Sequence, residues 1–169
     1  MFTAKDVMAL REMSGAGMMD CKKALVECDG DMDKAMDYLR EKSLAASAKK
    51  ASRIAAEGVV SSYVSPDSKT GVIAEVNCET DFVAKTDDFK ALVDTVAKLV
   101  AEQDPQDVDA LMALDTGDGT VAEMITRAVA KIGEKITIRR FARSHVEGGM
   151  VDCYVHLGGK IGVLVEIAC

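Results

Sequence analysis

The sequence lacks any apolar run that approaches the roughly 20 residues needed to span a bilayer. Near its start it carries charges at Lys5, Asp6, Arg11 and Glu12, where a secretory signal peptide needs an uninterrupted apolar stretch. We therefore expect a cytoplasmic protein that does not contact membranes. At 169 residues the chain is long enough for one domain, or for two small ones, with a core of its own.

Positive charge is also scarce. The chain has 21 basic and 28 acidic residues, which gives a formal net charge of -7. Binding to nucleic acid depends on clustered Lys and Arg that neutralise phosphates. The one basic stretch, residues 42–53, is explained more simply as a solvated helix face. The composition thus argues against nucleic acid as a direct partner.

Catalytic and metal-binding motifs are missing too. The five cysteines form no CxxC pair and no Cys/His cluster with zinc spacing, which favours reduced thiols in a cytosol. No Walker, GxSxG, HExxH or dinucleotide-binding motif occurs. Cys153 and His156 are three residues apart, so on a strand their side chains would point to opposite faces. We expect a protein that is not an enzyme and holds no metal or cofactor.

Residues 1–45 predict three short helices joined by glycine turns. Val7 and Leu10 share one face of the first helix at i, i+3 spacing, and residues 14–17 (SGAG) end that helix. A bundle of about 45 residues is too small to be very stable alone, so we interpret it as a docking module. Residues 46–56 are rich in Ala and Ser and predict a helical connector.

The pattern then changes to alternating β-branched residues over 58–77, split by a turn at residues 65–68, which predicts a hairpin. An amphipathic helix is expected next, as far as about Glu102. Asp104 followed by Pro105 predicts the start of a further short helix. Another helix and a strand are predicted over residues 120–132 and 135–143.

The chain contains an internal repeat at an offset of 91 residues. Residues 57–78 align with 148–169 without a gap, and nine of the 22 positions are identical. The identical pairs are Gly58/Gly149, Val60/Val151, Tyr63/Tyr154, Val64/Val155, Lys69/Lys160, Gly71/Gly162, Val72/Val163, Glu75/Glu166 and Cys78/Cys169. Because glycines, tyrosine and lysine keep their register, we interpret the pair as a duplicated unit in an α+β fold.

The repeat divides the rest of the chain into two predicted parts. The first core subdomain, with its intervening helices, is placed at 57–146. The second begins at 147–169 and is incomplete, since it lacks the turn and the covering helix that follow the first copy. The sequence leaves open whether the chain is a fragment of a longer protein or whether a partner completes it.

Three longer motifs give the chain a specific resemblance. They are residues 10–25 (LREMSGAGMMDCKKAL), 77–85 (NCETDFVAK) and 130–140 (AKIGEKITIRR). All three are very similar to motifs of bacterial elongation factor Ts, and the resemblance covers essentially the whole chain. Members of that family are guanine-nucleotide exchange factors for elongation factor Tu. They have a three-helix N-terminal domain of ubiquitin-associated type and a core of duplicated α+β subdomains.

The resemblance implies how the chain would act. It would bind GDP-loaded and nucleotide-free elongation factor Tu through its N-terminal domain, disturb the magnesium and phosphate site, and touch another domain with its second hairpin. The resemblance implies that Leu10, Met18 and Met19 dock on the nucleotide-binding domain. It implies that Thr80, Asp81, Phe82 and Val83 disturb the magnesium site. The residues implied for the contact of the second subdomain are Tyr154, His156 and Gly158. An adaptor that uses the N-terminal bundle alone is the alternative, and it leaves the Asp-Phe pair and the repeat unexplained.

Two features depart from the family pattern. Many members have a longer second subdomain, often with a helical hairpin and a C-terminal segment, and these 169 residues contain neither. The stretch 157–160 is also one residue longer than the corresponding turn in the family. The resemblance therefore supports the contacts of the first two motifs more directly than those of the second subdomain.

The same residues also allow simpler interpretations. Met18 and Met19 could be core residues, although neighbouring helix positions point about 100° apart, so at least one is expected at the surface. Phe82 could fill the core beneath the following helix, and Asp81 could be the N-cap of that helix. His156 has no carboxylate or cysteine at ligand spacing, so we expect a surface or hydrogen-bonded histidine.

Overall fold

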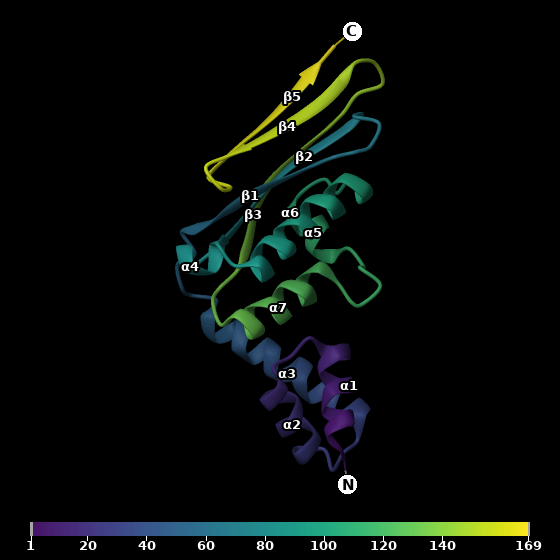
Figure 1. Cartoon of the computed structure of the whole chain (residues 1–169), viewed down its shortest axis with the longest axis vertical. Helices are drawn as coiled ribbons and strands as arrows, with labels where there is room; N and C mark the ends of the chain where they lie inside the picture. The colour runs from purple at the N-terminus through teal and green to yellow at the C-terminus, as the bar shows by residue number, and fades with distance from the viewer. Residues whose placement is uncertain (1, 169) are drawn as a thin grey trace. The chain divides into compact units, whose positions relative to one another are not determined.

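The computed structural model describes residues 2–168 (Figure 1). Its contacts divide the chain into two units. One holds the residues up to 53 together with 123–135, and the other holds 54–122 together with the residues from 136 on. The chain is mixed helix and strand, which confirms the predicted α+β class. Within residues 2–168, no helix combines the length and the apolar character that crossing a bilayer requires.

The first unit contains a bundle of three helices. They are α1 (Ala4–Ser14), α2 (Met18–Glu27) and α3 (Met32–Lys50). Thr3 and Asp6 form a capping box at the start of α1, in which the Thr3 backbone N–H donates to the Asp6 carboxylate at 2.6 Å. The bundle core is made by Val7, Leu10, Cys21, Ala24, Leu25, Ala35 and Leu39. Three helices in the first part of the chain are thus confirmed.

Helix α3 is longer than the sequence predicted. It passes through residue 45 to Lys50 without a break, because its last turns contain Ala, Ser and Lys but no Gly or Pro. The third helix and the first part of the connector, residues 46–50, are therefore one helix, and the predicted helical connector over 51–56 is wrong. Its end is held within the same unit by Lys135, whose ammonium donates to the carbonyls of Ala51 at 2.7 Å and Arg53 at 2.9 Å. The domain limits proposed from the sequence stay predictions.

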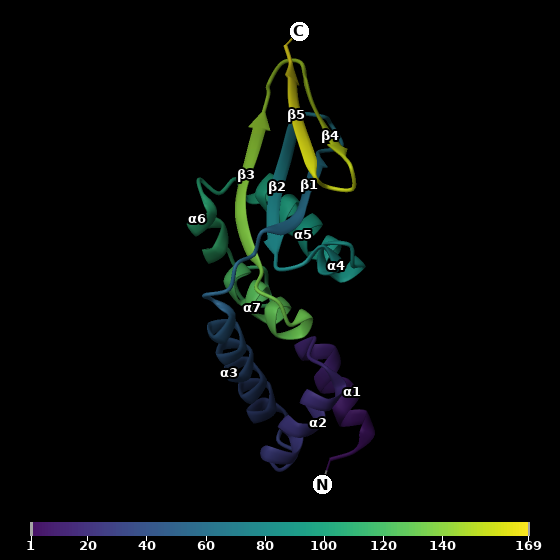
Figure 2. The same cartoon turned by 90° about the vertical axis from the view of Figure 1, so that its left-hand side faces the viewer.

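The second unit is built on an antiparallel three-stranded sheet in the order β1–β2–β3 (Figure 2). The strands are β1 (Glu57–Val64), β2 (Thr70–Cys78) and β3 (Thr137–His145). This arrangement confirms the predicted hairpin and the strand after it. Helix α5 (Asp87–Gln103) packs on β1 and β2 and closes one face of the sheet. The side chains buried there are Val72, Ala74, Val76, Phe89, Val93, Val96 and Val100.

The helical stretch after β2 differs from the prediction in two places. It is divided into α4 (Asp81–Ala84) and α5, because the Thr86 side chain accepts a hydrogen bond from the Phe89 backbone N–H at 3.3 Å and starts a new helix. The prediction of a helix start at Asp104 was wrong. Asp104 has a φ of 49° and ends α5, whereas α6 (Val108–Ala113) is capped by Asp107. The next helix, α7 (Val121–Ile132), is formed as predicted.

The second hairpin reproduces the register of the first. It consists of β4 (Met150–His156) and β5 (Ile161–Ile167). Val59 pairs with Val76 in the first hairpin, and Met150 pairs with Ile167 in the second, which are the same positions shifted by 91 residues. The predicted duplication is therefore confirmed in the described residues. Cys169, the predicted match of Cys78, lies outside them.

The two hairpins pack against each other with approximate two-fold symmetry, on the face of the first sheet that α5 leaves uncovered (Figure 1). The Val60 backbone N–H donates to the Gly159 carbonyl at 2.7 Å. The Val151 N–H donates to the Ser68 carbonyl at 2.8 Å, and this is the same contact with the two hairpins exchanged. The turn of each hairpin thus rests on the first strand of the other.

Paired glycines allow this close approach. A Cβ added at Gly162 would lie 2.5 Å from Cγ1 of Val60, and a Cβ at the matching Gly71 would clash with Cγ1 of Val151. Both valines are β-branched and have little rotamer freedom with which to move away. The identity of these two pairs in the repeat is explained by this packing.

We expect Gly71→Ala to lower the free energy of unfolding by about 1–3 kcal/mol, because the added methyl group overpacks the space that buried Val151 fills. Urea denaturation measures the loss. Gly148→Ala is the matched control, since a Cβ there meets no heavy atom within 4 Å. Equal stability of the two variants would contradict the proposed role of the glycine.

Candidate functional site

The candidate site of the second unit is the short helix α4, which follows β2. Its N-cap is Thr80, whose hydroxyl accepts a hydrogen bond from the Val83 backbone N–H at 3.4 Å. The Cys78 thiol donates to the Thr80 carbonyl at 3.2 Å, and buried Ala84 lies at the other end of the helix. The helix packs on β1, β2 and α5. These contacts hold α4 in place on its inner side.

Phe82 projects from α4 into solvent. Its side chain is 79% exposed, whereas Phe89 in α5 is completely buried. The interpretation of Phe82 as a core residue is therefore wrong, because Phe89 occupies that place. Burying a Phe side chain is worth roughly 1.5–3 kcal/mol, so the exposed ring offers this free energy to a partner with a matching pocket.

Asp81 is the first residue of α4, and the N-cap role suggested for it belongs to Thr80. The Asp81 carboxylate forms an ion pair with Lys85, with 2.6 Å between the oxygen and the ammonium nitrogen. The hydrogen bond from Lys85, and to a lesser extent the charges of Lys85 and Lys160, lower the pKa of the Asp81 carboxyl. The carboxylate therefore stays ionised to a more acidic pH than an ordinary aspartate.

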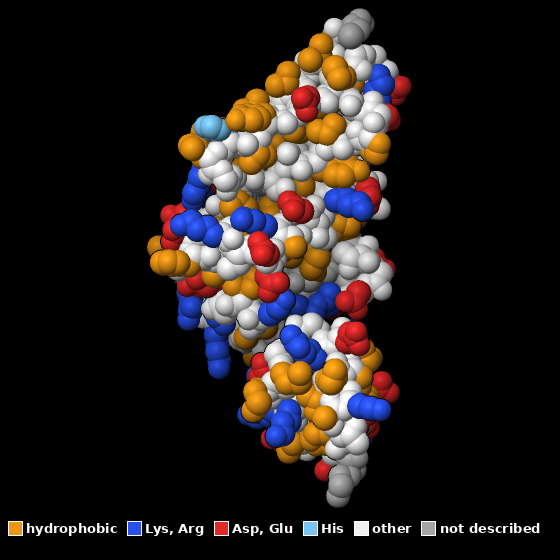
Figure 3. Space-filling model, in the orientation of Figure 1, with side chains coloured by type: hydrophobic (Ala, Val, Ile, Leu, Met, Phe, Trp, Pro, Cys, Tyr) orange, Lys and Arg blue, Asp and Glu red, His pale blue; other side chains and the backbone are white. Residues whose placement is uncertain are grey.

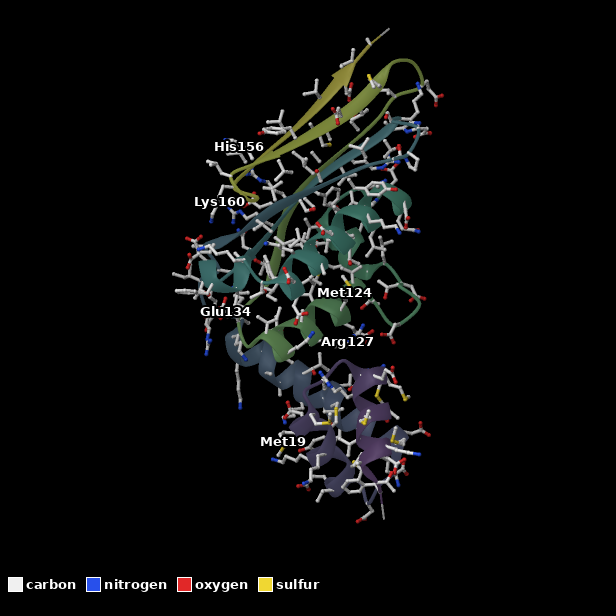
Figure 4. The ribbon with its side chains drawn as sticks, viewed as in Figure 1. Met19, Met124, Arg127, Glu134, His156 and Lys160 are labelled. Carbon is white, nitrogen blue, oxygen red and sulfur yellow. The ribbon has the colours of Figure 1, made fainter. Side chains whose placement is uncertain are left out.

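The first unit exposes methionines at the start of α2. The side chain of Met18 is 42% exposed. That of Met19, labelled in Figure 4, is 73% exposed. Leu10 is completely buried in the bundle, so a direct contact with a partner is not open to it, and it holds the helices together instead. Met8 and Met13 of α1 are also exposed and were not among the predicted residues. The i, i+3 spacing from Leu10 suggests that Met13 shares the buried face, and this is wrong because its side chain is 55% exposed.

The turn between β4 and β5 brings the three remaining predicted residues together. Tyr154 is 62% exposed, and its hydroxyl lies 2.9 Å from Nδ1 of His156, with the two rings stacked. Gly158 is exposed in the turn. Leu157 was missed by the sequence reasoning, although its side chain is exposed and its φ of 51° is rare for a leucine. The longer turn at 157–160 was the signal for it.

Apolar side chains gather on the outer face of this second hairpin (Figure 3). The exposed ones are Met150, Tyr154, Ile161, Val163, Val165 and Ile167. In the first hairpin Val72, Ala74 and Val76, which match Val163, Val165 and Ile167, are buried under α5. Within residues 2–168 no helix packs on the second hairpin as α5 packs on the first.

A groove of about 610 Å³ lies between the first sheet and the β4–β5 turn. Its charged side chains already pair with one another: Arg140 contacts Glu75 at 2.7 Å, and Lys160 contacts Glu57 at 2.7 Å. In the described part of the chain, no group of three or more His, Cys, Asp or Glu side chains is arranged to hold a metal ion. The features that stand out on α4, on α2 and on the turn are instead their exposed apolar side chains.

Comparison with known proteins decides the family. A sequence model described as "Elongation factor TS" matches residues 79–169, which include α4 and the second hairpin. The chain belongs to the elongation factor Ts family. It is 57% identical over 171 residues to Elongation factor Ts of Clostridium perfringens (strain SM101 / Type A), an alignment that covers 100% of this chain and 56% of that protein.

Other relatives in the elongation factor Ts family agree. Elongation factor Ts of Clostridium tetani (strain Massachusetts / E88) is 52% identical over 172 residues, covering 100% of this chain and 57% of that protein. That of Clostridium acetobutylicum (strain ATCC 824) is 50% identical over 169 residues, covering 99% and 55%. The chain thus spans about half the length of these relatives, and the N-terminal bundle lies within the aligned part.

In this member of the elongation factor Ts family, we expect Phe82→Ala to change the free energy of unfolding by less than about 0.5 kcal/mol, because the ring is in solvent. Phe89→Ala is the matched comparison and should lower it by about 3–5 kcal/mol through loss of a buried ring. Urea denaturation of both variants provides the measurement. A large loss in Phe82→Ala would mean that this ring belongs to the core.

Proposed function

We propose that the chain is a guanine-nucleotide exchange factor that binds elongation factor Tu with GDP and promotes GDP release during translation elongation. The observation that carries the proposal is the exposed ring of Phe82 on α4, in a chain of the elongation factor Ts family. The partner includes both the GDP-bound and the nucleotide-free form of elongation factor Tu. The chain makes and breaks no covalent bond, needs no cofactor, acts in the cytoplasm and binds neither nucleic acid nor membranes directly.

The free energy of exchange explains why more than one contact is needed. A factor that weakens GDP binding is itself weakened by GDP to the same extent. A 10⁴-fold effect requires about 5.5 kcal/mol of differential binding. One buried Phe side chain supplies roughly 1.5–3 kcal/mol, so Phe82 alone is too small. Adaptable methionine side chains suit a second docking surface, and Met18 and Met19 supply one.

Three surfaces of the chain would each make a different contact with elongation factor Tu: the start of α2, the helix α4 and the β4–β5 turn. Met18 and Met19 dock the bundle on the nucleotide-binding domain of elongation factor Tu. Asp81 and Phe82 enter next to the magnesium ion, where an ionised carboxylate and a ring disturb the metal and phosphate contacts. Thr80 and Val83 support them, since their hydrogen bond caps α4. The hairpin turn with Tyr154, His156 and Gly158 contacts another domain of the GTPase.

Phe82→Ala should reduce GDP release more than it reduces binding to GDP-loaded elongation factor Tu, because the ring acts at the metal site and its binding free energy is gained as the nucleotide leaves. The rate is measured by mixing the variant at saturating concentration with elongation factor Tu that carries a fluorescent GDP analogue. Affinity is measured separately with the GDP-bound partner. Equal losses of rate and affinity would refute this role, and no acceleration by the unmodified chain would refute the proposed function itself.

Met18→Ala and Met19→Ala should mainly weaken binding, each by about fivefold or more if it is a true anchor of the interface. The dissociation constant with nucleotide-free elongation factor Tu tests this by calorimetry. Val26→Ala is the control, since Val26 is exposed on the same helix but lies at its other end. Unchanged affinity in both methionine variants would place the docking surface elsewhere.

A further inference from the structure

We propose that Lys160 is a positioning residue for α4: it fastens the turn of the second hairpin to the strand pair from which α4 starts. Phe82 and the tip of the second hairpin are then presented to a partner as one surface. The consequence for nucleotide exchange rests on the function proposed above. The positioning itself is a property of the free chain and can be measured without a partner.

A short series of contacts leads from Lys160 to α4. The Lys160 ammonium donates to Oε2 of Glu57 at 2.7 Å. Glu57, the first residue of β1, is the register partner of Cys78, the last residue of β2. The Cys78 thiol in turn donates to the carbonyl of Thr80 at 3.2 Å, and Thr80 caps α4. The ion pair therefore acts at the base of the strands that carry the helix.

The backbone next to Lys160 is seated on the same strand. The Gly159 carbonyl accepts a hydrogen bond from the Val60 N–H at 2.7 Å. A Cβ added at Gly159 would lie 2.7 Å from Cβ of Val59, so only glycine fits so close to β1. Figures 1 and 2 both place the β4–β5 turn on the side of the unit where α4 lies, and Figure 4 shows Lys160 in that turn. Lys160 is thus the charged last residue of a turn whose backbone is held against β1.

The charges of Lys160, Glu57 and Asp81 also affect one another. The hydrogen bond to Glu57, followed by the charges of Glu57 and Asp81, raises the pKa of the Lys160 ammonium. The positive charge of Lys160 in turn helps to lower the pKa of the Asp81 carboxyl, after the larger effect of Lys85. Lys160 therefore acts on the charged residue next to Phe82 as well as on the base of the strands.

The duplication supplies a matched control. Lys69 is the counterpart of Lys160 in the first hairpin, and its ammonium donates to the carbonyl of Gly149 at 2.7 Å. It joins the same two hairpins. However, Lys69 follows the turn between β1 and β2, whereas α4 starts at the opposite end of that hairpin. Loss of either lysine should affect the packing of the hairpins, but only loss of Lys160 should affect α4.

Amide hydrogen exchange in the free chain tests the positioning. The reporters are the backbone N–H groups of Ala84, Lys85 and Thr86, which donate to Thr80, Phe82 and Val83. Lys160→Ala should accelerate their exchange about two- to fivefold, the range that an exposed ion pair supports. Lys69→Ala should leave these amides unchanged. The charge-reversed double variant Glu57→Lys/Lys160→Glu should restore most of the protection.

Stimulated GDP release then tests the consequence. With elongation factor Tu and a fluorescent GDP analogue, Lys160→Ala at saturation should slow release about two- to fivefold, and Lys69→Ala should not. Unchanged amide exchange in Lys160→Ala, or the same acceleration in Lys69→Ala, would overturn the positioning role. If the unmodified chain does not stimulate release at all, the proposed function fails, while the amide measurement still decides the role of Lys160.

Discussion

The close packing of the two hairpins is the constraint on which the second unit depends. Val60 and Val151 fit against glycines at Gly162 and Gly71, and any larger residue at those two places would separate the sheets. This packing lays the turn of each hairpin on the first strand of the other. As a result, α4 and the β4–β5 turn lie at one end of the unit, although they are far apart in the sequence. The candidate site exists because of that arrangement.

The two hairpins are related by approximate symmetry where they pack together, but their other faces, which point away from each other, differ. In the first hairpin, β2 directs Val72 and Val76 into a core closed by α5. In the second, the matching positions Val163 and Ile167 are exposed in the described part of the chain. The same strand pattern therefore has two physical outcomes, since a strand specifies which of its sides is apolar but not what covers it.

Sequence reasoning succeeded where periodicity and the repeat determine the structure, as in the bundle, both hairpins and their common register. It failed where one hydrogen bond changes the path of the chain. Phe82 and Phe89 are seven residues apart, so in one continuous helix they would share a face and both be buried. The Thr86 cap begins a new helix between them, which leaves Phe89 in the core and Phe82 in solvent. Thr86 before Asp87 and Asp88 was a readable cap signal.

The direction of the Phe82 ring is set by tertiary contacts, because α4 has only four residues and a helix of that length is not stable by itself. Its shape is maintained by the Thr80 cap, the Cys78 thiol and the burial of Ala84. All three depend on the base of β1 and β2, where the second hairpin also rests. An exposed ring on such a support gains binding free energy only if the support holds it still, since each freely rotating side chain loses entropy on binding. The stacked hairpins therefore help to hold the Phe82 ring in one direction, which is the condition that the proposed function sets.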